Sequence, residues 1–479
     1  MDDRAPRQIV LVLTDQQRAD LTAREGFPRD CTPTLDNLAT TGRWFDRAYT
    51  TTPLCVPARI SLLTGRFPSA HGVLGNTGYH DPARGADLVD VVGRAGFRTA
   101  LIGKNHSHLT PDRMDHWAEY SHYGRIPPTA ATGADRDFDD WLRANPGTTT
   151  TPTPFALAQQ LPVRLVDEAI DWLDSAGPDD RSLLWLSIPE PHVPYQVPEP
   201  YFSGYGPDTV PPPATTSAVL ADRDFAWRYA GRLAELSGEA APAVLARARA
   251  NYVGMLRLVD DQLSRLVDHL RRTGRLATTL FVHLADHGDF AGEYGLMRKG
   301  PGLPEVLARI PLLFHGPGVR PAPRPSHAHV SIADVLPTIC ELLDEPVPAG
   351  VQGRSLVPLL RDPEADGFTS VYAEQGDGTP ILQAEPAGRL PGVRETPSGD
   401  LAVDTVNEIT QSGRRRMVRA DRWKLLSTAD GAVQLFDLEA DPFELEDLAD
   451  RAEHAETLRH LRGELEHWID LIHRTSGIT

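Results

Sequence analysis

The sequence is poor in cysteine and contains no long apolar run. Three cysteines among 479 residues, Cys31, Cys55 and Cys340, are too few and too scattered to form a disulfide framework. No stretch approaches the roughly 18 apolar residues of a membrane span. Residues 1–8 are polar and the apolar run that follows is short, so no signal peptide is expected. These absences favour a soluble protein of the reducing cytoplasm, with Cys31 and Cys340 as structural thiols.

The balance of charge also excludes several partners. The net charge of −18 argues against nucleic acid and anionic membranes as main partners. A small anionic substrate remains compatible, because a local basic pocket can oppose the overall sign. Only three of the 48 basic side chains are lysines, at Lys104, Lys299 and Lys424. Because an ammonium is not interchangeable with a guanidinium, a chain that otherwise uses arginine indicates special roles at some of these positions.

The order of predicted elements indicates an α/β protein. The length exceeds the roughly 250–300 residues at which single cores stop growing, so we expect a large domain over residues 1–366 and a smaller one over 367–479. Apolar runs predict strands at 8–13, 97–102, 182–188 and 278–284. Helical patterns are found at 35–41, 88–95, 162–175 and 243–273. This alternation favours a large, mainly parallel sheet flanked by helices.

The C-terminal part has a different pattern. Short alternating segments lie at 370–373, 416–418, 423–426 and 433–436, and an amphipathic helix is predicted at 455–472. Together they predict an antiparallel sheet covered by one helix. We interpret the run Arg414-Arg415-Arg416 as a solvated turn rather than a binding patch.

Polar residues follow all four predicted strands of the large domain. These segments are Thr14-Asp15-Gln16-Gln17, Gly103-Lys104-Asn105-His106, Pro191-His192-Val193-Pro194 and Asp286-His287-Gly288. In open α/β sheets, ligands bind outside the carboxyl ends of the strands, so one assembled polar site is expected. Asp15 alone could equally be a helix N-cap, but its pairing with an Asp-His at another strand end favours a metal site.

The segment from Leu54 to Arg66 carries the most specific signal. Pro57 suits the first turn of a helix and Gly65 its end. Cys55 therefore lies at a helix N-terminus, where free N–H groups and the helix dipole favour negative charge. Taken alone, the segment leaves open a structural cysteine or a thiol of low pKa.

In its surroundings, this segment resembles the formylglycine-dependent (type I) sulfatases of the alkaline-phosphatase-like superfamily. Their signature, Cys-x-Pro-x-Arg followed by Thr-Gly-Arg, appears here as Cys55 to Arg59 and Thr64 to Arg66. The resemblance extends over nearly the whole chain, through segments at 32–39, 45–49, 103–106, 286–300, 422–426 and 435–442. It implies the alkaline-phosphatase/sulfatase-like fold, with a smaller C-terminal α+β subdomain.

The resemblance also implies a reaction, the hydrolysis of sulfate esters or sulfamates. Cys55 would be oxidised to formylglycine by a formylglycine-generating enzyme. One hydroxyl of the hydrated aldehyde, activated by a divalent metal, would attack sulfur and form a covalent sulfo-enzyme intermediate. The second hydroxyl would then lose its proton and expel sulfate, a step that an ordinary serine or cysteine cannot perform.

Site residues are carried over from the family motifs. The metal ligands would be Asp15, Gln16, formylglycine at position 55, Asp286 and His287. Many relatives have Asp at the position of Gln16 and Asn at that of His287. This difference makes the ligand set less purely hard, so calcium is the family default while manganese and magnesium are alternatives.

The remaining roles concern the reacting groups. Arg59 would orient the diol or neutralise the carboxylates, and Lys104 and Lys299 would bind the sulfate oxygens. Lys299 would also help the leaving oxygen. His106 would be the base for the second hydroxyl and His192 the donor to the leaving group. Asn76 resembles a position that contacts the substrate anion in some relatives, although Gly-Asn is also a common turn.

Two rival functions remain open at this stage. Phosphonate monoester and phosphodiester hydrolases of the same fold share the formylglycine, the Asp-Gln start and the Asp-His pair, but they tend to lack the Lys104-x-His106 element. A non-catalytic anion-binding protein would keep an unmodified Cys55. The substrate, which the long segments 107–154 and 201–240 are expected to select, and the oligomeric state do not follow from the sequence.

Overall fold

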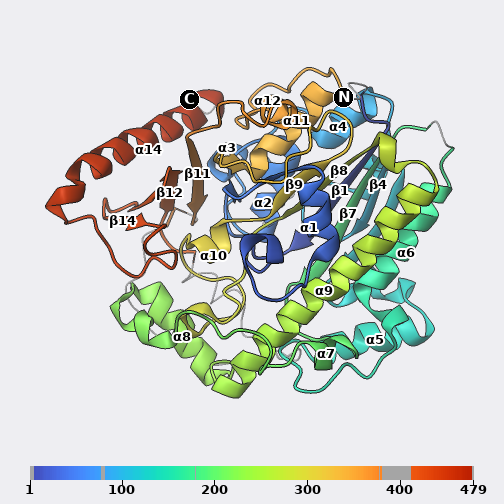
Figure 1. Ribbon diagram of the computed structural model, residues 1–479, viewed down its shortest axis with the longest axis horizontal. Coiled ribbons are helices and arrows are strands. Elements are labelled where there is room, and N and C mark those ends of the chain that lie inside the picture. Colours follow the sequence, from blue (N-terminus) through green and yellow to red (C-terminus); the bar gives the residue numbers. More distant parts are fainter. Residues whose placement is uncertain (1–4, 77–80, 178–179, 377, 380–410, 477–479) are drawn as a thin grey trace.

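The computed structural model describes residues 5–76, 81–177, 180–376, 378–379 and 411–476. Its centre is an eight-stranded sheet with the strand order β2-β9-β8-β1-β7-β4-β5-β6 (Figure 1). In that order the strands are β2 (Arg43–Phe45), β9 (Leu312–His315), β8 (Thr279–Ala285), β1 (Gln8–Asp15), β7 (Ser182–Pro191), β4 (Arg98–Gly103), β5 (His116–Ser121) and β6 (Gly124–Arg125). The five strands from β8 to β5 are parallel, and antiparallel strands lie at both edges.

Helices cover both faces of this sheet. Successive residues of β1 point to opposite faces, so that Ile9, Leu11 and Leu13 belong to one core and Val10 and Val12 to the other. The first core is closed by α2 (Cys55–Thr64), α4 (Leu88–Arg94), α11 (Val335–Leu342) and α12 (Val357–Arg361). The second is closed by α1 (Pro33–Thr40), α5 (Gly133–Ala144), α6 (Leu161–Asp174) and α9 (Pro242–Arg272). Figure 1 shows α6 and α9 along one side of the sheet and α4 and α11 on the opposite side.

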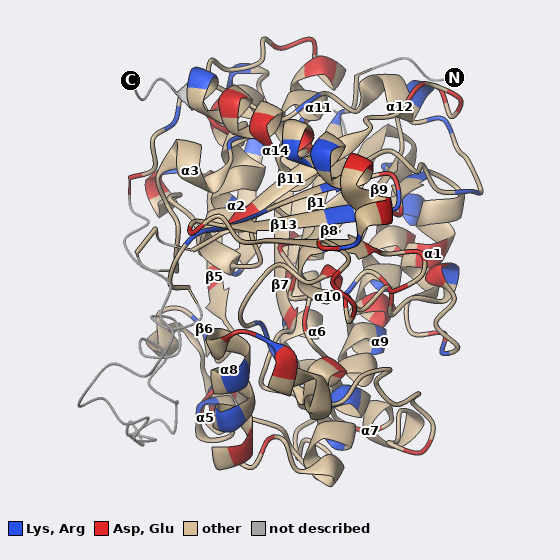
Figure 2. Cartoon of the chain, turned by 90° about the vertical axis from the view of Figure 1, so that its left-hand side faces the viewer, with Lys and Arg blue, Asp and Glu red and all other residues tan. Residues whose placement is uncertain are grey.

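The C-terminal part forms a second sheet. Its antiparallel strands, in order, are β11 (Ser370–Gln375), β12 (Arg415–Ala420), β13 (Trp423–Thr428) and β14 (Val433–Asp437). The long α14 (Ala455–Ser476) packs on this sheet, and its Trp468 also contacts Phe67 of the larger part. Figure 2 shows charged residues of both signs along α14, whereas the strands are mostly uncharged.

Shorter elements complete the chain. They are the helices α3 (Pro68–His71), α7 (Tyr201–Gly204), α8 (Phe225–Leu236) and α10 (Glu305–Ala308) and the two-stranded pair β3 (Ala48–Tyr49) and β10 (Val330–Ser331). Within the described part of the chain, no helix combines the length and the apolar character that crossing a bilayer requires.

The predicted fold class is confirmed, because a large mixed sheet flanked by helices precedes a smaller antiparallel sheet with a helix. The exact division at residue 366 stays a prediction. The interpretation of the arginine run as a solvated turn was wrong. Arg415 begins β12, is buried, and lies 3.2 Å from Asp224, the residue that precedes α8 (Phe225–Leu236). Cys31 and Cys340 are buried free thiols.

Candidate active site

The parallel strands bring the predicted side chains to one edge of the large sheet. Asp15 ends β1, while Asp286, His192 and Lys104 directly follow β8, β7 and β4. These four strands are consecutive in the sheet, in the order β8-β1-β7-β4. Gly103 allows the end of β4 to lie close to Ser187 of β7. A Cβ at this position of positive φ would collide with the carbonyl oxygen of Ser187. The structure therefore assembles residues that lie up to 271 positions apart in the sequence.

Cys55 is the first residue of α2 and lies against these strand ends. Its Sγ is 3.0 Å from Nζ of Lys299, 3.3 Å from Nε2 of His287 and 3.7 Å from Oδ1 of Asp15. Burial and the Asp15 carboxylate raise the pKa of the thiol, but nearby cations, the ammonium groups of Lys104 and Lys299 foremost, hold this pKa well below its usual value. The position thus stabilises a negative charge on side chain 55.

Arg59 lies one turn further along α2 and connects two buried carboxylates. Its Nη2 donates to Oδ2 of Asp15 at 3.0 Å, and its Nε donates to Oδ2 of Asp286 at 2.9 Å. Its Nη1 donates to the Lys104 carbonyl at 2.8 Å and to Oγ of Ser187 at 2.7 Å. The guanidinium and both carboxylates are completely buried, so Arg59 fixes the relative position of two strand ends.

Four side chains could share one metal ion. The ligand atoms of Asp15, Cys55, Asp286 and His287 all lie within 4.8 Å of one another. Burial and the charge of Asp15 raise the pKa of Asp286. Arg59 already pairs with both carboxylates, but carboxylate oxygens and an imidazole nitrogen that converge in this way are ligand types of divalent metals, so the donor set fits such an ion.

The ring of His287 is oriented toward this cluster. Its Nδ1–H donates to the carbonyl of Gly288 at 2.8 Å, and its Nε2 faces Sγ of Cys55. A hydrogen bond of this kind fixes the tautomer of a metal-binding histidine. Carboxylate oxygens with one imidazole suit calcium less exclusively than an all-oxygen set and also admit manganese or magnesium.

Gln16 is adjacent to this cluster. A hydrogen-bond network that the sequence did not reveal sets the orientation of its side-chain amide. Its Nε2 donates to the carboxylate of Asp289, which also accepts from the Tyr195 hydroxyl at 2.6 Å. The amide oxygen Oε1 consequently lies toward Lys299, 3.5 Å from its Nζ. Gln16 therefore presents an oxygen, not an N–H group, to the side on which Lys299 and Cys55 lie.

The two predicted sulfate-binding lysines flank position 55, Lys104 from the end of β4 and Lys299 from the loop between β8 and α10. Lys104 is completely buried and donates to Oδ2 of Asp15 and, at 3.0 Å, to Nε2 of His122. Lys299 contacts Cys55 Sγ and donates to Nε2 of His192 at 3.3 Å. Both ammonium groups lie where an anion on residue 55 would need counter-charges.

The two predicted catalytic histidines are both held neutral. Burial and the Lys104 ammonium lower the pKa of His106 to about 4, although its hydrogen bond with Cys55 acts in the opposite direction. Burial and the Lys299 ammonium hold the pKa of His192 well below its usual value. The Nδ1–H of His192 donates to the Val193 carbonyl at 2.7 Å, so its Nε2 acts as an acceptor.

Asn76 lies beside the start of α2. Its Oδ1 accepts a hydrogen bond from the backbone N–H of Val56 at 3.2 Å. This contact satisfies one of the free donors at the helix N-terminus and leaves the amide nitrogen of Asn76 as a further donor.

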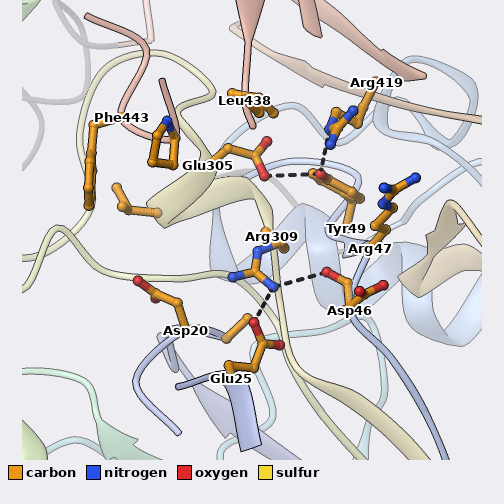
Figure 3. A pocket seen from close by; sticks show the side chains of 13 residues that line it. Asp20, Glu25, Asp46, Arg47, Tyr49, Glu305, Arg309, Arg419, Leu438 and Phe443 are labelled. Atoms are coloured by element: carbon orange, nitrogen blue, oxygen red, sulfur yellow. Dashed lines mark hydrogen bonds and ion pairs between the residues drawn. The ribbon is translucent and has the colours of Figure 1, made fainter. Parts of the chain in front are cut away.

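A cavity of about 280 Å³ elsewhere in the molecule is not this site (Figure 3). None of the predicted site residues lines it. Its charged groups engage one another: Arg309 donates to Glu25 at 2.6 Å, and Tyr49 lies between Glu305 and Arg419 at 3.0 and 3.2 Å. These interactions engage four of the charged groups that line the cavity.

Comparison with known proteins identifies the family. The sulfatase family model matches residues 7–345. The chain belongs to the sulfatase family. The chain is 27% identical to an arylsulfatase of Clostridium perfringens, over 95% of this chain and 92% of that protein. It is also 27% identical to a choline-sulfatase of Rhizobium meliloti, over 92% and 82% of the two chains.

Solved structures show the same fold. The crystal structure of a phosphonate monoester hydrolase of Agrobacterium radiobacter superposes with a TM-score of 0.77 at 23% identity, covering 98% of this sulfatase and 96% of that chain. The predicted family and fold are therefore confirmed, as is the expectation that the chain is a sulfuric ester hydrolase. The roles of individual site residues stay predictions.

Proposed function

We propose that this sulfatase hydrolyses sulfate esters or sulfamates at a formylglycine produced from Cys55. The observation that carries the proposal is the position of Sγ of Cys55, 3.0 Å from Lys299, 3.3 Å from His287 and 3.7 Å from Asp15. In the matured enzyme, the hydroxyl groups of the hydrated aldehyde would occupy the region that Sγ marks here. A formylglycine-generating enzyme would be the partner required for maturation.

Asp15, Gln16, Asp286, His287 and residue 55 would hold one divalent metal ion, with calcium, manganese and magnesium as candidates. When bound, the ion supplies Lewis acidity that favours the ionised form of the nucleophile at position 55. Arg59 contributes by fixing both carboxylates, at 3.0 and 2.9 Å, from a completely buried position.

Lys104 and Lys299 would bind the non-bridging oxygens of the sulfuryl group. Their ammonium groups are already placed by Asp15 and His192, so little reorganisation is needed when charge develops. Preorganised donors of this kind act most strongly in a site from which water is excluded. Asn76, whose amide nitrogen is not engaged by the helix N-terminus, would add a donor to the substrate anion.

Proton transfer would be divided between two histidines. His106, whose pKa of about 4 keeps it neutral, would accept the proton of the second hydroxyl at position 55. His192 accepts from Lys299 through Nε2, so the proton for the leaving oxygen would be held by the Lys299–His192 pair. Lys299 would thus assist the leaving oxygen together with His192, the two residues that the resemblance implies for this step.

Phosphonate monoester hydrolysis is the second candidate. It is favoured by Gln16 in place of the more frequent Asp, and the Agrobacterium radiobacter hydrolase has the same fold. The pair Lys104 and His106 favours sulfate. Parallel kinetics on an aryl sulfate and an aryl phosphonate would rank the two activities by kcat/KM.

The decisive experiment uses protein co-expressed with a formylglycine-generating enzyme. Mass spectrometry of the Cys55 peptide should show conversion of the thiol to the aldehyde, and the metal-loaded protein should hydrolyse p-nitrophenyl sulfate. The Cys55→Ala protein is the matched control and should be inactive. Fully converted, metal-loaded protein without activity on aryl, alkyl or carbohydrate sulfates would overturn the proposal, and a persistent thiol in the native host would favour the non-catalytic alternative.

A further inference from the structure

A fifth parallel strand also delivers a polar side chain to the active site. β5 pairs in parallel with β4, and the residue that directly follows β5 is His122. The sequence analysis did not single out this residue, which lies in the long segment expected to select the substrate. Each of the five parallel strands thus ends at a site residue, and His122 occupies the β5 position.

His122 contacts three of the predicted reacting groups. Its Nε2 lies 3.0 Å from Nζ of Lys104. Its ring stacks on that of His192, with centroids 3.7 Å apart and planes inclined by 8°. The edge of the His106 ring approaches it at a centroid distance of 6.0 Å.

The contact with Lys104 determines how the ammonium can act. An ammonium has three donors, and among the described residues the Lys104 ammonium donates to Asp15 and His122. Burial, the His192 ring and the Lys104 ammonium keep the pKa of His122 well below its usual value, so Nε2 can accept. Two donors are thereby occupied, and the third is left for an oxygen of the substrate.

The stacking contact restrains His192. The two nitrogens of His192 are engaged by the Val193 carbonyl and by Lys299, at 2.7 and 3.3 Å. These bonds lie in the plane of the ring, whereas His122 covers its face. Together the contacts fix both the position and the plane of the imidazole.

The turn that carries His122 is itself held in place. His122 and Tyr123 form the tip between β5 and β6, where the N–H of Tyr123 donates to Oγ of Ser121 at 3.1 Å. Gly124 has a positive φ, and a Cβ there would collide with the carboxylate of Asp139 on α5. That carboxylate also accepts from the N–H of Arg125 at 3.0 Å, so the hairpin is anchored to the scaffold.

We propose that His122 is a positioning residue of the sulfate site, which aims the Lys104 ammonium through its Nε2 and fixes the ring plane of His192 by stacking. The proposal rests on the proposed sulfatase function for the roles of Lys104 and His192. It assigns two separable tasks to one side chain, one through a nitrogen acceptor and one through a ring face.

Two variants separate these tasks. His122→Phe keeps the ring face but removes the acceptor, whereas His122→Gln keeps an acceptor oxygen but removes the ring. We expect His122→Phe to lower kcat/KM by about 10-fold or more on both p-nitrophenyl sulfate and an alkyl sulfate, because it loses a hydrogen bond to a charged group. We expect His122→Gln to lower kcat/KM mainly on the alkyl sulfate, whose poor leaving group depends on protonation.

A binding measurement makes the test independent of turnover. Calorimetric titration with inorganic sulfate should show about 10-fold weaker binding to His122→Phe and unchanged binding to His122→Gln. If the matured wild-type protein hydrolyses no sulfate ester, the proposed function fails, and this titration still decides whether His122 aims Lys104. Kinetic values are normalised to the formylglycine content of each preparation.

His116→Gln is the matched control on the same hairpin. Its ring lies 3.5 Å from Glu168, away from the reacting groups, and the variant should retain wild-type kinetics and sulfate affinity. Thermal unfolding of all variants distinguishes a general loss of folding from a displacement of Lys104 or His192 in a folded protein. Equal losses in both His122 variants on both substrates, or sulfate binding by His122→Phe as tight as in the wild type, would overturn the assignment.

Discussion

The side-chain amide of Gln16 is oriented by Asp289, because Nε2 of Gln16 donates to the Asp289 carboxylate. The same carboxylate accepts from the hydroxyl of Tyr195 at 2.6 Å and from the backbone N–H of Ala291 at 2.6 Å. Three donors therefore converge on one buried acid. Many relatives have a carboxylate at position 16 itself. Here the carboxylate belongs to Asp289, which lies behind the Gln16 amide and is therefore not itself a proposed metal ligand.

This network predicts the effect of Asp289→Asn on metal affinity. A carboxamide cannot accept all three hydrogen bonds, so the oxygen of Gln16 would lose its orientation. Outer residues that orient metal ligands typically contribute 10- to 100-fold to affinity, and we expect a loss of about that size. Titration calorimetry with calcium and manganese measures it, with Tyr195→Phe as the control that keeps the carboxylate. Unchanged affinity in Asp289→Asn would show that Gln16 does not depend on Asp289.

Arg59 has a predicted role in stability as well as in the site. Arg59→Ala leaves Asp15 and Asp286 buried without their guanidinium partner. Removing one member of a buried ion pair typically costs about 3–5 kcal/mol, and we expect a loss of this order in the free energy of unfolding, measured with urea in the presence of a chelator. Arg59→Lys, which keeps the charge, should lose less. A divalent cation should restore part of the stability of Arg59→Ala, because it replaces the missing positive charge.

Much of the site followed from the sequence because its residues stand directly after apolar strands. Asp15, Lys104, His192 and Asp286 carry this signal, and the helix around Cys55 has proline and glycine at its ends. His122 lacked the signal, because β5 is half-buried and reads His-Trp-Ala-Glu-Tyr-Ser instead of a continuous apolar run.

Long-range pairing accounts for the other differences. Arg415 is buried because Asp224, 191 residues earlier in the chain, accepts its hydrogen bond. Asp289 lies within two residues of His287, but its contact with Gln16 spans 273 positions. Local patterns indicate where a chain bends or becomes helical, and they contain no information on which distant side chain will neutralise a charge.

Glu190 predicts a pH-dependent change in stability. It is 4% exposed near the end of β7, and burial raises its pKa to about 8, although its backbone hydrogen bond and Arg164 oppose this shift. The folded state therefore keeps a proton that the unfolded chain releases above the ordinary pKa of 4.5. Stability from this group is present below pH 4.5 and is lost as the pH rises toward 8, by about 1.4 kcal/mol per pH unit.

Glu190→Gln removes this titration while keeping the shape of the side chain. We expect the variant to have a higher free energy of unfolding than the wild type at pH 8 and a similar one at pH 4, measured by urea denaturation at both values. Burial also raises the pKa of the partly exposed Glu119 on β5, so Glu119→Gln should show a change of the same sign but smaller size. A difference between Glu190→Gln and the wild type that does not change with pH would contradict a neutral Glu190 in the folded state.

For two of the three lysines, Lys104 and Lys424, we expect opposite outcomes from the same substitution. Lys424 is completely buried and donates to the Leu303 carbonyl at 2.5 Å, while Glu305 and Glu444 lie 3.1 and 2.6 Å from its Nζ. Leu303 and Glu305 belong to the part of the chain that contains the large sheet, and Glu444 follows β14. Lys424 therefore connects β13 to both segments. Lys104 is buried equally, but it faces the reacting groups.

Lys424→Arg should therefore affect stability, whereas Lys104→Arg should affect the reaction. A guanidinium is larger than an ammonium, and overfilling a packed site typically costs about 1–3 kcal/mol, which thermal or urea unfolding of Lys424→Arg would detect while kcat/KM stays at the wild-type value. Lys104→Arg misplaces the donor next to the sulfuryl oxygens, and we expect kcat/KM on p-nitrophenyl sulfate to fall on the order of 100-fold. The formylglycine content of both proteins must be equal. If Lys424→Arg instead lost activity at unchanged stability, Lys424 would take part in the reaction. The assignment of Lys424 to stability and of Lys104 to the reaction would then be wrong.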